Sequence, residues 1–116
     1  MAGMSCVLCA IAAGATPATV FHKADDILAI APLRPAARVH ILLFPTEHFA
    51  DLPALLNSQP AQATATMKVA QDLASQHGLT STGYRPVWNY GPDTHQRIGH
   101  PHLHLLGGQD LRSVTP

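Results

Sequence analysis

Residues 100–106, which read His-Pro-His-Leu-His-Leu-Leu, are the stretch from which the rest of the chain is interpreted. If this stretch is a strand, its period of two places His100, His102 and His104 on one face of a sheet. Imidazole can attack phosphorus, donate hydrogen bonds to phosphate oxygens, transfer protons near neutral pH or bind a metal. The stretch therefore predicts a strand that carries a chemical site, and the alternatives are a metal-binding histidine tract and a solvated edge strand.

The remaining sequence predicts short strands joined by turns, together with one long helix. Apolar segments at 19–22 and 27–31 flank a polar turn and indicate a hairpin, and the apolar run 39–44 indicates a central strand. Another strand is expected at 84–89, and short helices at 6–13 and 50–56. Residues 59–77 contain no glycine and predict a long helix that ends at Gly78. Its sheet-facing residues are predicted to be Ala63, Met67, Ala70, Leu73, Ala74 and His77. This order of elements predicts an antiparallel α+β fold.

Length and composition restrict the class of protein. A chain of 116 residues is expected to form one domain over 1–116. The formal net charge is zero, so no basic surface is available for a nucleic-acid polymer, whereas single nucleotides remain possible ligands. No segment has the roughly 20 apolar residues of a membrane span. We therefore expect a cytoplasmic protein with a small-molecule ligand and no membrane partner.

Two cysteines, Cys6 and Cys9, are separated by two residues. A thioredoxin-like redox motif would require a preceding strand, which the sequence does not offer. A disulfide is disfavoured in a cytoplasmic chain. The spacing fits half of a zinc site, although two ligands do not complete a tetrahedron. From the residues alone, a zinc site and a reduced, metal-free pair both stay open.

The alternation of histidines with Pro101, Leu103 and Leu105 resembles the signature of the histidine triad (HIT) superfamily of nucleotide hydrolases and transferases. The resemblance extends upstream to residues 83–91, Gly-Tyr-Arg-Pro-Val-Trp-Asn-Tyr-Gly, to Gln96, and to the segment 39–48. It thus covers nearly the whole chain. It implies a HIT-like α+β fold with a five-stranded antiparallel sheet, one long helix, a short N-terminal helix and a homodimeric assembly.

The resemblance also implies roles for the histidines. His102 corresponds to the nucleophile that attacks the α-phosphorus and forms a nucleotidyl-histidine, which water then hydrolyses. His104 would bond to phosphate oxygens and assist the leaving group, with His100 as the first triad histidine. His40, in the neighbouring strand, would orient the catalytic imidazole. The expected activity is hydrolysis of nucleoside phosphoramidates or dinucleoside polyphosphates with release of a nucleoside monophosphate.

Two groups of binding residues follow from the same resemblance. Asn89 and Gln96 would contact the nucleotide, although Asn-x-Gly-Pro is also ordinary turn chemistry. The zinc-containing branch of the superfamily implies a structural zinc, whose ligands here would be Cys6, Cys9, His48 and His100.

The sequence departs from the family pattern at two positions. Pro32, followed by Leu33, stands where many members carry an acidic residue for the ribose hydroxyls. Arg97 stands where a hydroxyl residue is usual, and its planar fork suits phosphate or carboxylate. Leu33 and Arg97 are therefore counted among the nucleotide-binding candidates. These departures keep two alternatives open, a nucleotide-binding or partner-binding protein with weak turnover and a nucleotidyltransferase.

Overall fold

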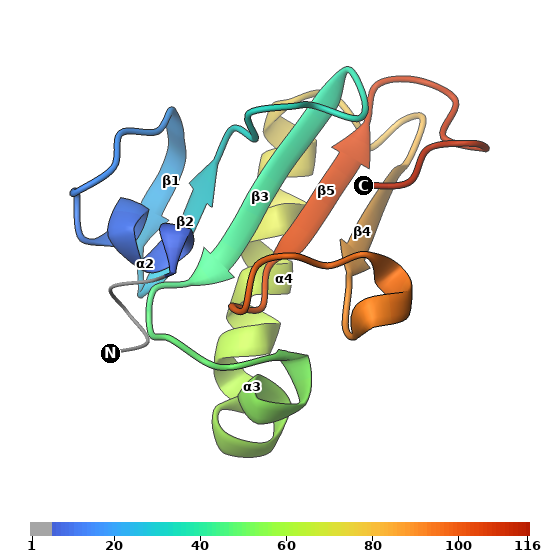
Figure 1. Cartoon of the computed structure of the whole chain (residues 1–116). Coiled ribbons are helices and arrows are strands. Elements are labelled where there is room, and N and C mark those ends of the chain that lie inside the picture. Colours follow the sequence, from blue (N-terminus) through green and yellow to red (C-terminus); the bar gives the residue numbers. More distant parts are fainter. Residues whose placement is uncertain (1–5) are drawn as a thin grey trace.

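Five antiparallel strands form one sheet in the computed structural model, which describes residues 6–116 (Figure 1). They are β1 Val20–Ala24, β2 Ile27–Ile30, β3 Val39–Pro45, β4 Tyr84–Trp88 and β5 Leu103–Gly107. Their order across the sheet is β1-β2-β3-β5-β4. The central strand is therefore β3, and it pairs with β5, which is far from it in the sequence. The predicted antiparallel α+β fold is confirmed.

The helices lie on both sides of this sheet. They are α2 Val7–Ala12, α3 Leu52–Ser58 and α4 Pro60–Gln76, with a 3-10 turn, η1, at Pro92–Thr94. The long helix α4 runs along one face (Figure 1). Its Ala70, Leu73 and Ala74 pack on strand residues that include Ile41 and Leu105, and together they form the main core. Within residues 6–116, no helix is both long and apolar enough to cross a membrane.

Two positions predicted to face the sheet, Met67 and His77, are wrong, because both are exposed; His77 lies just after the last residue of α4. Met67 is 39% exposed, whereas Thr66 is fully buried and faces the sheet. The Thr66 hydroxyl donates a hydrogen bond to the carbonyl of Gln62, 2.8 Å away, one turn earlier in the helix. Because this bond satisfies the hydroxyl inside the helix, a polar residue can occupy the core face at little cost.

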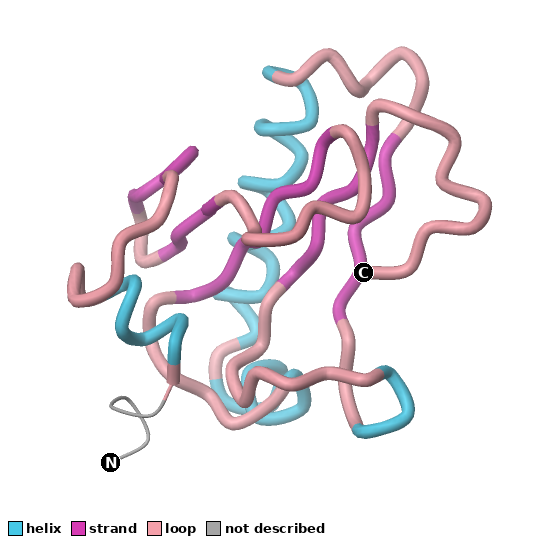
Figure 2. The backbone as a smooth tube through the Cα atoms, turned by 45° about the horizontal axis from the view of Figure 1, so that its top comes forward, coloured by secondary structure: helices cyan, strands magenta, loops and turns pink. Residues whose placement is uncertain are grey.

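The short helix α2 covers part of the opposite face of the sheet (Figure 2). Its Leu8 packs with Leu28 and Ile30 of β2 and with Phe44 of β3. Side chains alternate along β3, so Ile41 and Leu43 point to α4 and Leu42 and Phe44 point to the α2 side. His40 lies two residues before Leu42 and therefore points to the same face of the sheet. His104 is paired with Leu42 in the β3–β5 register and shares that face. These two histidines therefore lie on the face that α4 does not cover.

The last strand begins later than predicted. His100, Pro101 and His102 precede β5, which starts at Leu103, so only His104 of the three histidines lies within the strand. Proline has no backbone N–H and cannot complete a ladder of hydrogen bonds. The prediction of a strand over 100–106 is thus wrong for its first three residues.

Candidate active site and metal centre

His102 is held in one tautomer by the chain itself. Its Nδ1 lies 2.8 Å from the carbonyl oxygen of His100. A carbonyl can only accept, so the hydrogen is on Nδ1 and the lone pair is on Nε2. The side chain is only 7% exposed. Burial lowers the pKa of His102, partly offset by the bond to His100, so the neutral imidazole is the form present near pH 7. His102 therefore offers a fixed, unprotonated Nε2.

A second chain of hydrogen bonds fixes His40 and His104. The backbone N–H of Ala36 donates to His40 Nδ1 at 2.9 Å. The hydrogen of neutral His40 is consequently on Nε2, which lies 2.9 Å from His104 Nδ1 and donates to it. His104 then carries its own hydrogen on Nε2. His40 thus sets the tautomer of His104 across two neighbouring strands. The prediction that His40 orients the nucleophile is corrected, because Nδ1 of His102 is bonded to the His100 carbonyl instead.

Burial also keeps these two imidazoles neutral. It lowers the pKa of His104 to about 4, with smaller contributions from the neighbouring His102 and His40. Burial likewise lowers the pKa of His40. The rings of His102 and His104 are 5.0 Å apart between centroids, at 61°. The arrangement places a nucleophilic nitrogen beside an N–H donor, which is a combination suited to an anionic electrophile such as a phosphate.

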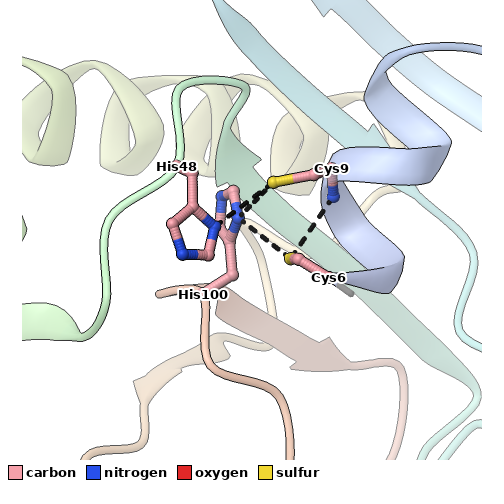
Figure 3. Close-up of side chains that lie close together, drawn as sticks. All are labelled: Cys6, Cys9, His48 and His100. Atoms are coloured by element: carbon pink, nitrogen blue, oxygen red, sulfur yellow. Dashed lines mark hydrogen bonds between the residues drawn. The ribbon is translucent and has the colours of Figure 1, made fainter. Parts of the chain in front are cut away.

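Cys6, Cys9, His48 and His100 form a separate cluster (Figure 3). Cys9 Sγ lies 3.2 Å from His48 Nδ1 and 3.5 Å from His100 Nδ1, and Cys6 Sγ lies 3.4 Å from His100 Nδ1. All four donor atoms are within 4.8 Å of one another. Cys6 and Cys9 are free thiols.

The cluster fits a tetrahedral metal ion. Bonds of about 2.3 Å to sulfur and 2.0–2.1 Å to nitrogen would separate the ligand atoms by about 3.4–3.8 Å, close to the distances found. His100 Nε2 donates to the carbonyl of Pro45 at 2.8 Å, which leaves Nδ1 as the free lone pair inside the cluster. Without a cation, burial and the adjacent Cys6 raise the pKa of the Cys9 thiol to about 11. The four residues are therefore a candidate metal centre.

The other residues predicted to bind the nucleotide differ from one another in exposure and in contacts. Gln96 donates from Nε2 to the carbonyl of Ile98 at 2.7 Å, so its side chain already stabilises the loop. Asn89 is half-buried just after β4. Arg97 is exposed and lines a cavity of about 350 Å³ together with Gln96 and Tyr90. Leu33 is fully exposed at the edge of a larger cavity.

That larger cavity, of about 700 Å³, is a feature that the sequence analysis missed. Its walls come from α2, the segment after it, the end of β2, the centre of β3 and the loop before His100, and they include Leu8, Ile11, Ile30, Pro32, Leu42 and Ile98. Leu42 is the β3 partner of His104, so the cavity adjoins the hydrogen-bonded histidines His40 and His104. No sequence pattern marks such a cavity, because each segment contributes only one to four residues.

The fold and the site together define a class of small α+β proteins in which histidines of the central strands adjoin an apolar cavity. The HIT domain family matches this chain over residues 13–111. An uncharacterized HIT-like protein of Synechococcus elongatus is 38% identical over 95 residues, which is 82% of each chain. The chain belongs to the HIT family.

Solved structures agree with this assignment. A HIT family hydrolase from Legionella pneumophila has a TM-score of 0.89 at 36% identity and covers 94% of this chain and 97% of its own. A Zn-bound histidine triad family protein from Mycobacterium smegmatis has a TM-score of 0.80 at 30% identity, over 97% of this chain and 81% of that one. The predicted HIT-like fold is thereby confirmed.

Proposed function

We propose that this protein hydrolyses nucleoside phosphoramidates or dinucleoside polyphosphates at the α-phosphorus and releases a nucleoside monophosphate. The observation that carries the proposal is the bond from His102 Nδ1 to the His100 carbonyl, which leaves Nε2 as a fixed nucleophile. The similarity to a HIT family hydrolase from Legionella pneumophila supports the reaction class.

The reaction proceeds in two displacements. His102 Nε2 forms a bond to the α-phosphorus, and the bond from phosphorus to the leaving group breaks and takes its electron pair with the leaving group. The imidazolium of the resulting nucleotidyl-histidine keeps its Nδ1 hydrogen on the His100 carbonyl, which stabilises the positive charge. Water then attacks phosphorus, His102 leaves as the neutral imidazole, and the proton that water loses replaces the one taken up by the leaving group. One difficult substitution is divided into two easier ones.

His104 supplies the neighbouring donor. Because His40 occupies its Nδ1, the hydrogen on His104 Nε2 is available to a phosphate oxygen or to the atom of the leaving group that gains charge. The nucleoside occupies the cavity of about 700 Å³ that adjoins Leu42, with Leu33 at its rim. Asn89, Gln96 and Arg97 approach the phosphates from the loops before His100.

A structural zinc is the second part of the proposal. Cys6, Cys9, His48 and His100 supply the Cys2His2 donor set of closed, four-coordinate sites, and the similar protein from Mycobacterium smegmatis is described as Zn-bound. When bound, zinc would crosslink α2 to the loop before β5. It would leave His102 and His104 free for substrate.

Release of AMP from adenosine 5′-phosphoramidate tests the function. We expect turnover by the parent protein and loss of at least a thousandfold in His102→Ala, because the nucleophile is absent. His22→Ala, which changes a histidine of the edge strand β1, is the matched control and keeps parent activity.

Two other outcomes would contradict hydrolysis. Binding of AMP without turnover would favour a nucleotide-binding protein, and exchange of the nucleotidyl group with a second phosphate would favour a transferase.

The homodimer and the cytoplasmic location stay predictions. Light scattering would test the homodimer, because a dimer doubles the 12.3 kDa of one chain.

A further inference from the structure

Among residues 6–116, no charged side chain lines the cavity beside the histidines. All seven acidic residues of the chain, namely Asp25, Asp26, Glu47, Asp51, Asp72, Asp93 and Asp110, lie outside its lining. The lining is aliphatic except for Thr16 and Thr19, whose hydroxyls are its side-chain polar groups. At the end of β2, where the wall turns away from the sheet, it is formed by Pro32 and Leu33.

A ribose presents a vicinal diol, which a protein reads best with an ionised acceptor. A hydrogen bond to a charged acceptor changes affinity by about 10- to 150-fold, and a bond between neutral groups by about 2- to 10-fold. A site built to bond a hydroxyl therefore rejects the analogue that lacks it, whereas an apolar wall does not. Here proline offers no side-chain acceptor, and leucine offers none.

We infer that this cavity binds the organic group of the substrate by apolar contact and does not read the sugar hydroxyls, so that 2′-deoxynucleotides are accepted as readily as ribonucleotides. The inference deepens the proposed function and rests on it for the identity of the ligand. Shape and apolar area, supplied by Ile11, Ile30 and Leu42, select the base, and the phosphate is recognised separately by the histidines.

The affinities of AMP and 2′-deoxy-AMP, measured by calorimetry, test the inference. We expect the two dissociation constants to agree within about tenfold, which is the range that a threonine hydroxyl can supply. A preference for AMP of more than about tenfold, or no binding of either nucleotide, overturns the inference.

Three variants make the test specific to the cavity. Pro32→Asp places a carboxylate at the end of β2, and we expect it to raise the preference for AMP by about tenfold or more, whereas Pro32→Ala leaves the ratio unchanged. Any repulsion between the new carboxylate and phosphate cancels in the ratio. Ile11→Trp fills the cavity and should weaken the binding of AMP and of 2′-deoxy-AMP equally. An unchanged ratio in Pro32→Asp, or unchanged affinities in Ile11→Trp, overturns the placement of the nucleoside.

The two proposals fail in different ways. If adenosine 5′-phosphoramidate binds and no AMP is released, hydrolysis is refuted while the affinity ratio still decides the inference. If the protein releases AMP and rejects the 2′-deoxy substrate by more than about tenfold, hydrolysis stands and the inference is refuted.

Discussion

Cys9→Ser removes one of the four side chains that surround the candidate metal centre. Cys9 lies in α2 and Cys6 is the N-cap residue of that helix, and among residues 6–116 the backbone hydrogen bonds of residues 6–16 stay within that segment. A helix of six residues is not stable alone, so α2 depends for its position on side-chain contacts and, when the proposed zinc is bound, on that ion. Metal loss should therefore loosen α2 while the sheet persists.

The magnitude follows from mass action. At a free zinc concentration a thousandfold above the dissociation constant, binding stabilises the folded state by about 4 kcal/mol. With an unfolding entropy of about 2.1 cal/mol/K per residue, loss of that energy lowers the midpoint of a chain of 116 residues by about 16 °C. Buried Leu8 still contributes about 2–3 kcal/mol of apolar contact, so the variant is expected to fold.

Metal analysis, thermal unfolding and hydrogen exchange measure this effect. The parent protein should carry about one zinc per chain, and Cys9→Ser less, with faster exchange of the amides of residues 7–12. His77→Gln, which changes an exposed histidine outside the cluster, should keep the metal content of the parent. Equal metal content and midpoints within about 2 °C for parent and Cys9→Ser would refute the reasoning, as would the absence of zinc from unchelated parent protein.

Three further predictions concern the histidines and the core. Because the pKa of His104 is about 4 in the folded chain against 6.5 in the unfolded chain, the unfolded state binds more protons between these values. The free energy of unfolding should therefore fall as pH decreases from about 6.5 to 4, and the urea midpoint of His104→Gln should fall less; an equal fall would contradict it. His40→Ala removes the donor that fixes His104 Nδ1 and should lower kcat by about 10- to 100-fold with little change in KM, measured by steady-state kinetics; an unchanged kcat would count against the assigned tautomer. Gly107→Ala should destabilise the fold by about 1–3 kcal/mol in urea unfolding, because the added Cβ would lie 2.8 Å from Leu79 Cδ1, and a neutral result would mean that Leu79 moves freely.

Local patterns were sufficient for most elements of the fold. The hairpin, the central strand and the long helix were all predicted, since turn chemistry and side-chain periodicity act over a few residues. The hairpin turn illustrates the reason: Asp25 and Asp26 have positive φ values of 55° and 64°, which short polar residues tolerate. The errors came where side-chain type was a poor guide to burial, as with Thr66, which can be buried because its hydroxyl bonds within the helix.

The candidate site depends more on the tertiary structure than the strands and helices do. The sequence by itself determined which residue types are present, namely the alternating histidines and the cysteine pair, and their resemblance to the HIT family. The grouping of His100 with Cys6, 94 positions away, was implied by that resemblance, whereas the tertiary structure alone decided that His40 bonds to His104, 64 positions away. It also decided the tautomers, which depend on which backbone group lies opposite each ring nitrogen. The apolar cavity has the same origin, because its walls meet only when the register of the central strands and the docking of α2 bring distant segments together.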